Sequence, residues 1–273
     1  MEIEIILGRL SLAAYFVSTL FYIGSLLIQR VHPARTATGI FAFAFTAHTM
    51  TIIALWMKTG HGPILTIHDV FSFFSWVVGG TYLIFQLRTK TRVLGALVAP
   101  VSFILLTMAS AGLGGPVIIP EILKSGLVSV HAMLSVIGEA LFAVASLSGL
   151  MYLLQDNRIK HKKARKFIHY LPSLHDLDRI NHTCLLWGFP LMTLGILSGF
   201  IWSWVVWGSL WQWDSKLMWA SGAWIVYALL LHQRLAIGWK GHKAALFSVV
   251  AFVLLGCAFA VEKAFFTTIH RFF

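Results

Sequence analysis

The feature that most constrains this chain is a recurring run of about 20 apolar residues, the length that an α-helix needs to cross the hydrocarbon core of a bilayer. Of the 273 residues, 58% are hydrophobic and only 11% are charged. Transmembrane β-strands would alternate apolar and polar side chains, whereas these runs are continuous. The sequence therefore predicts an all-α polytopic membrane protein that forms one integral membrane domain over residues 1–273.

We expect about eight membrane-spanning helices. Their approximate ranges are 5–27, 37–57, 70–87, 93–111, 128–154, 183–205, 217–235 and 245–261. The connections after the first, third, fifth and seventh span hold 15 of the 21 basic residues, and the longest of them is a basic loop at 155–182. Because basic loops remain on the cytoplasmic side, this pattern predicts that both termini lie outside. It also accounts for the net charge of +11, so nucleic acid is not expected as a partner.

A second unusual feature is the stretch 199–224, which contains seven of the 11 tryptophans and lies between the sixth and seventh expected spans. Trp204, Trp207 and Trp211 are spaced by three and four residues, so they would form one aromatic stripe on a helix. Such a stripe suits a flat, apolar, aromatic ligand. The alternative is an interfacial belt, in which tryptophans lie at the level of the lipid headgroups. A belt explains so many indoles around one WxWD sequence poorly, so we favour the ligand.

Three histidines lie where they could bind a metal-containing ligand. His48 is near the middle of the second expected span, where an ionisable side chain usually faces the protein interior or a cavity. His131, one turn inside the fifth span, and His270, near the C-terminus, are both expected at the level of the tryptophan stretch. Neutral imidazole is a common axial ligand of haem iron. Core histidines that bond to neighbouring groups are the alternative, and the sequence does not show that His131 and His270 converge.

The sequence WGSLWQWDSKLMW at 207–219 closely resembles the tryptophan-rich WWD signature of the cytochrome c assembly family, which comprises haem-handling membrane proteins of the CcsA, HemX and CcmC type. The flanking sequences LPSLHDLDRIN at 171–181 and WIVYALLLHQRLAIGWKG at 224–241 resemble the CcsA/HemX branch. The upstream sequence AHTMTIIALWMKTGHGP at 47–63 resembles the same branch. The resemblance covers nearly the whole chain in the expected order.

The resemblance implies a protein that exports haem b, its transported substrate, and presents it to apocytochrome c as the CcsA-like half of a cytochrome c haem lyase. His131 and His270 would be the axial ligands of the haem iron, and His48 would ligate haem in transit. The cofactor-binding surface would comprise Trp202, Trp204, Trp207, Trp211, Trp213, Asp214 and Trp219. The implied partners are a ResB/CcsB-like membrane protein and apocytochrome c with its CxxCH motif. The implied location is the bacterial cytoplasmic membrane, with the WWD stretch on the outer, periplasmic face.

Two other functions stay open at the level of the sequence. A HemX-type membrane protein that affects haem biosynthesis shares the WWD signature. A b-type electron-transfer cytochrome would hold haem permanently, but it usually needs paired histidines within spans, and here only His48 lies at mid-depth.

Overall fold

The computed structural model describes residues 3–28, 31–60, 62, 64–89, 91–111, 121–160, 171–210 and 215–265. Within these ranges the chain is helical and contains no strand, which confirms the expected all-α fold. The α-helices are α1 (Ile3–Ile28), α2 (Val31–Thr59), α3 (Ile67–Arg88), α4 (Gly95–Ser110), α5 (Gly126–Lys160), α6 (Leu174–Trp207), α7 (Ser215–Leu235) and α8 (His242–Phe265). Two short 3₁₀ helices, η1 (Arg92–Leu94) and η2 (Glu121–Lys124), precede α4 and α5.

The protein is an integral membrane protein. Among the described residues, seven helical segments are long and apolar enough to cross a bilayer, and η1 and α4 together form one of them. The helix outside this set is α7, which has 21 residues but ends in the polar sequence His232-Gln233-Arg234. The seventh expected span is therefore a helix of sufficient length that is less apolar than the others.

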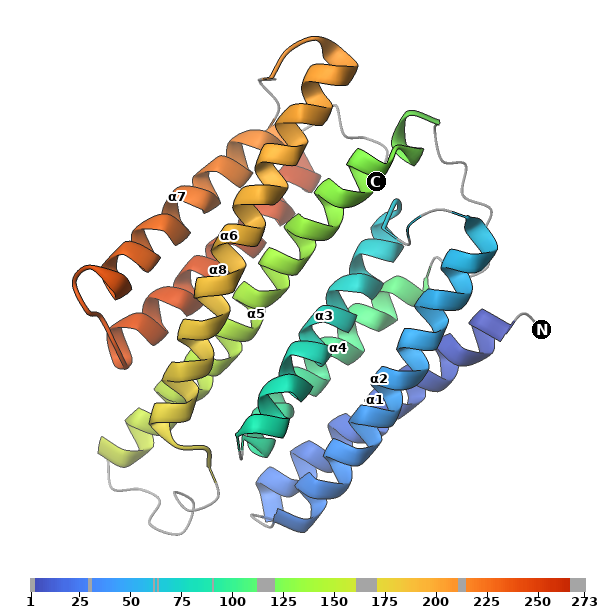
Figure 1. The fold of residues 1–273 in the computed structure, drawn as a ribbon. Coiled ribbons are helices and arrows are strands. Elements are labelled where there is room, and N and C mark those ends of the chain that lie inside the picture. The colour runs from blue at the N-terminus through green and yellow to red at the C-terminus, as the bar shows by residue number, and fades with distance from the viewer. Residues whose placement is uncertain are drawn as a thin grey trace.

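The helices form two groups of four, with α1–α4 on one side and α5–α8 on the other (Figure 1). Consecutive helices run in opposite directions, so α1 begins and α8 ends at the same end of the bundle (Figure 1). We call this end, which contains Trp202–Trp207, the tryptophan end, and the opposite end, where α5 reaches Lys160, the basic end. That the tryptophan end faces outside remains a prediction.

The connection between α5 and α6 is shorter than the predicted loop at 155–182. A salt bridge of 2.7 Å between Lys160 and Asp156, one turn apart, supports the last turn of α5. At the start of α6, the Ser173 hydroxyl accepts a hydrogen bond of 3.0 Å from the backbone N–H of Asp176, so Ser173 acts as an N-cap. Both helices thus extend into the range 155–182 that was expected to be a loop. The Ser173 N-cap and the Lys160–Asp156 salt bridge stabilise the helical conformation there in spite of the polar composition of this range.

The helices α5 and α6 pack closely along their lengths because glycines line their interface. A Cβ atom added to Gly138 would lie 2.8 Å from the backbone N of Met192 and 3.0 Å from the carbonyl oxygen of Gly188. A Cβ atom at Gly188 would lie 2.8 Å from the ring of Phe142. Small residues of this kind let membrane helices approach closely and gain van der Waals contact. This pair is the framework on which the candidate site lies.

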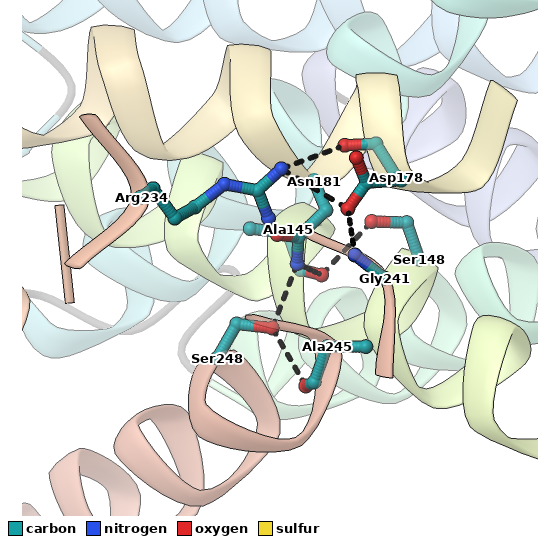
Figure 2. A network of polar contacts seen from close by, with 8 residues as sticks. All are labelled: Ala145, Ser148, Asp178, Asn181, Arg234, Gly241, Ala245 and Ser248. Atoms are coloured by element: carbon teal, nitrogen blue, oxygen red, sulfur yellow. Dashed lines mark hydrogen bonds and ion pairs between the residues drawn. The ribbon is translucent and has the colours of Figure 1, made fainter. Parts of the chain in front are cut away.

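A buried polar network joins the helices of the second group near the basic end (Figure 2). Arg234 of α7, only 6% exposed, donates hydrogen bonds to Asn181 Oδ1 at 2.7 Å and to Asp178 Oδ1 at 3.0 Å on α6. The backbone N–H of Gly241 donates to the same Asp178 oxygen at 3.0 Å. The guanidinium is buried and the Asp178 side chain is 22% exposed, so the two charges neutralise each other at the edge of the interior.

Asn181 extends this network to the other two helices of the group. Its amide nitrogen donates to the carbonyl oxygen of Ala145 on α5 and to the hydroxyl of Ser248 on α8, each at 2.7 Å (Figure 2). Asn181 is 1% exposed, so both contacts form in a low-dielectric interior, where they are strong. One amide side chain thus connects α5, α6 and α8, and Arg234 adds α7.

Replacing Arg234 should destabilise the protein strongly. The variant Arg234→Gln removes the charge partner of the partly exposed Asp178 and the donor to Asn181, which costs about 1.5–3 kcal/mol and lowers the melting temperature by roughly 3–12 °C. The measurement is thermal unfolding of the purified protein in detergent, followed by size-exclusion chromatography. The matched control is Arg35→Gln on the exposed surface of α2, which should change the melting temperature little. Equal shifts in the two variants would contradict the assigned role of the network.

Candidate functional site

The imidazole of His131 lies between α5 and α6 near the tryptophan end. Its Nδ1 is 2.8 Å from the carbonyl oxygen of Gly195 on α6. A carbonyl oxygen can only accept a hydrogen bond, so Nδ1 carries the hydrogen and Nε2 carries the lone pair. Hydrogen bonds from the non-ligating nitrogen to a backbone carbonyl commonly orient metal-binding histidines and raise their basicity. The structure thus gives His131 the tautomer in which Nε2 can ligate a metal ion.

Two glycines of α6 make room for this ring. A Cβ atom at Gly199 would lie 2.8 Å from Cε1 and 2.9 Å from Nδ1 of His131. A Cβ atom at Gly195 would overlap with Ser135 of α5, one turn along from His131. The sequence alone did not indicate a role for these glycines, although their spacing of four residues places them on the same helix face as the α5 contact. Their lack of side chains is what allows the imidazole to reach the α6 backbone.

The ring of Trp202 lies one helical turn beyond the imidazole, at the same interface. Trp202 is 6% exposed and belongs to a buried cluster with Leu65, Leu123 and Val128. Val128 precedes His131 by one turn on α5, and Trp202 follows Gly199 by one turn on α6. The indole of Trp207 packs edge-on against Trp202, with ring centroids 4.8 Å apart and an interplanar angle of 76°. An aromatic pair and a correctly oriented imidazole thus occupy adjacent turns.

The stripe of Trp204, Trp207 and Trp211 does not lie on a continuous α6, because that helix ends before Trp211, which lies outside the described residues. The helix α6 ends at Trp207, because Gly208 adopts a left-handed conformation with φ of 68° and its N–H bonds to the carbonyl oxygen of Trp204. Trp204 is 57% exposed and Trp219 is 40% exposed, so both differ from the buried Trp202. Exposure of this kind suits either an interfacial belt or a surface open to a flat ligand.

Several predicted site residues lie outside the described part of the chain. They are His270, Trp211, Trp213 and Asp214. The convergence of His131 with His270 on one ligand therefore stays a prediction.

The other predicted histidine, His48, lies in the core of the first helix group. It is fully buried, and its Nε2 is 2.9 Å from the hydroxyl of Ser72 on α3. The ring meets the edge of Tyr15, with centroids 6.0 Å apart, and Nδ1 has no hydrogen-bond partner among the described residues. The predicted mid-helix position is confirmed, but the structure does not bring His48 to the His131 site, because the two belong to different helix groups.

Comparison with known proteins identifies relatives of the chain. The family model described as "Cytochrome C assembly protein" matches residues 91–267, well over half of the chain. The "Cytochrome c biogenesis protein CcsA" of Chlamydomonas reinhardtii is 31% identical over 217 residues, which cover 76% of this chain and 59% of that protein. The CcsA protein of Cycas taitungensis is 29% identical over 304 residues and covers 95% of this chain and 94% of its own length. The protein of the same name from Microcystis aeruginosa is 25% identical, with coverage of 93% and 92%.

The fold is similar to the solved structure of a protein named "Cytochrome c Heme Lyase CcmF". The TM-score is 0.66, the sequence identity is 15%, and the match covers 94% of this chain. The chain spans about half of that protein, 49% of its length. At this identity the similarity concerns the fold alone.

Replacing Gly199 by alanine should release the His131 ring from α6. The added methyl group would lie within 3 Å of the imidazole, so the ring must turn and lose its bond to Gly195. Loss of one hydrogen bond worth about 1 kcal/mol should raise the rate at which diethyl pyrocarbonate modifies His131 by roughly fivefold. Peptide mass spectrometry of the labelled protein measures this rate. Gly222→Ala, at a position with open space around the Cβ, is the control. An unchanged rate in Gly199→Ala would refute the contact.

Proposed function

The chain belongs to the cytochrome c assembly protein family, and we propose that it acts in cytochrome c biogenesis by exporting haem and presenting it to apocytochrome c. The observation that carries this proposal is the position of His131. Its Nδ1 bonds to the Gly195 carbonyl, and its ring lies one turn from the Trp202–Trp207 pair. A fixed imidazole beside an aromatic pair is suited to hold an iron porphyrin. Haem is the substrate of this reaction and leaves with the product.

In this proposal His131 binds the haem iron through Nε2 and His270 binds it from the opposite side. The Gly195 carbonyl holds the imidazole in the ligating tautomer, and Gly199 keeps the space that the ring needs. Trp202 and Trp207 close the floor of the site against water. The exposed indoles of Trp204 and Trp219, together with the WxWD sequence at 211–214, would cover the porphyrin face.

The acceptor in this proposal is an apocytochrome with the motif CxxCH. Each cysteine thiol adds across one haem vinyl group: the S–H bond and the π bond of the vinyl group break, one C–S and one C–H bond form, and no group leaves. The acceptor's histidine then replaces one of the two axial imidazoles. We propose that a ResB/CcsB-like membrane protein assists, and that the tryptophan end faces the outer, periplasmic side of a bacterial cytoplasmic membrane. The charge asymmetry of the loops supports this orientation.

The role of His131 can be tested with His131→Gly. The variant should lose bound haem or change its absorption spectrum, because one axial ligand is missing. Added imidazole should restore the wild-type spectrum by filling the vacated ligand position. The spectrum is measured on protein purified with and without its membrane partner, and haem staining of c-type cytochromes in a complemented deletion strain measures function.

The matched control is His68→Ala, which removes another histidine at the tryptophan end, on α3, whose ring bonds to the Met108 carbonyl at 3.3 Å. It should leave both the spectrum and cytochrome c maturation unchanged. If a double variant of His131 and His270 retained haem with an unaltered spectrum, the proposed site would be wrong.

For His48 we propose a core role in the described conformation, because haem could approach its buried ring only after α1, α2 and α3 separate. His48→Gln should retain the wild-type haem spectrum, because glutamine can still bond to Ser72. His48→Leu leaves Ser72 without this partner, which costs about 1–3 kcal/mol, or roughly 2–12 °C of melting temperature. Ser72→Ala should lower the melting temperature less than His48→Leu.

A different result for His48→Gln would contradict the core role of His48. If His48→Gln lost haem while its melting temperature stayed at the wild-type value, His48 would be a haem ligand in transit, as the family resemblance implies.

A further inference from the structure

A half-open groove of about 250 Å³ lies between α6 and α7. Its lining residues are Thr193, Ile196, Leu197 and Phe200 on α6, and Ser221, Trp224 and Ile225 on α7. An enclosed apolar cavity of about 150 Å³ is already large enough to bind benzene. The groove is therefore large enough to hold an apolar group of several carbon atoms.

Two polar groups of the lining, those of Thr193 and Trp224, bond to each other, and the hydroxyl of Ser221 is the third. The Thr193 hydroxyl donates to the carbonyl oxygen of Phe189 at 2.8 Å and accepts a hydrogen bond of 2.9 Å from the indole nitrogen of Trp224. Trp224 also packs against the ring of Phe189, with centroids 5.3 Å apart. Water in a cavity needs two to four polar partners, and this lining offers almost none. The groove therefore selects an apolar occupant.

The groove opens toward the bilayer, within one half of its depth. Leu197 and Ile225 at its mouth are 50% and 53% exposed, and α7 lies at the edge of the helix bundle (Figure 1). With a rise of 1.5 Å per residue, the groove residues of α6 lie about 4 to 14 Å from the middle of that helix toward the tryptophan end. The hydrocarbon core extends about 15 Å on each side of the bilayer centre. At this depth the surrounding medium is the acyl chain.

We propose that the groove binds one acyl chain of a phospholipid from the leaflet on the tryptophan side. Membrane helices associate through van der Waals packing, so an unfilled gap between α6 and α7 would forfeit contacts that a hydrocarbon chain supplies. The bound chain would act as a wedge that sets the spacing of the helix that carries Trp202–Trp207 from the helix that carries Trp219. This proposal does not depend on haem binding.

The test uses the full-length protein in phosphatidylcholine vesicles that contain a phosphatidylcholine with a diazirine group in one acyl chain. After irradiation, peptide mass spectrometry maps the cross-linked residues. Cross-links at 193–200 and 221–225 should exceed those at the exposed, lipid-facing positions Val250, Val253 and Leu254 of α8 by roughly tenfold, which corresponds to about 1.4 kcal/mol of preference. Ser221→Phe should fill the groove and reduce this excess to the α8 level.

The matched control is Gly222→Phe, which adds the same side chain on the adjacent, exposed position, where a Cβ atom meets nothing within 4 Å. Gly222→Phe should leave the excess of groove cross-links over those on α8 unchanged. If Ser221→Phe does not fold, Ile225→Trp at the mouth of the groove replaces it. Uniform labelling of α6, α7 and α8, or an excess that Ser221→Phe leaves unchanged, would overturn the proposal. If added haem abolished the excess of cross-links in the groove, the groove would be part of the haem site. That result would also overturn the acyl-chain proposal.

Discussion

The close contact between α5 and α6 is the constraint on which the rest of the structure depends. Gly138 and Gly188 allow the two backbones to approach, and the same contact, continued toward the tryptophan end, brings His131 onto the carbonyl oxygen of Gly195. A larger side chain at Gly199 would push the ring away. The orientation of one imidazole is thus set by helix packing over several turns rather than by a local loop, which makes the position rigid.

The two helix groups separate two kinds of histidine. His48 is buried among α1, α2 and α3, and its Nε2 forms a hydrogen bond with the Ser72 hydroxyl. His131 is half-buried and lies beside aromatic side chains at the end of the second group. The sequence made both histidines candidate ligands because of their expected depth in the membrane. Depth alone does not distinguish a core residue from a residue at the edge of a site. That distinction comes from the neighbours that tertiary packing supplies.

The sequence predicted the all-α membrane fold well, because long apolar runs leave a chain in a bilayer few alternatives to helices. It also placed His131 one turn inside α5, near the tryptophan stretch. It placed the end of the sixth span at residue 205, two residues before α6 ends, but it did not show that the left-handed conformation of Gly208 stops the helix before Trp211. It also missed Gly195 and Gly199, since a glycine has no side chain chemistry and its role appears only when the partner helix is known. The network around Arg234 is likewise built from residues far apart in the sequence.

That network has a consequence for the order in which the protein assembles during synthesis. Asn181 precedes two of its hydrogen-bond partners, Arg234 and Ser248, in the chain, so its side chain gains its full set of contacts only after α7 and α8 have been added. An arginine near the end of a helix is costly to insert alone, and α7 is the least apolar of the long helices. The contacts of Asn181 with α5, α7 and α8 are therefore complete only when α8 is in place. A chain that stops before α8 would leave the amide nitrogen of Asn181 without the Ser248 hydroxyl as a partner.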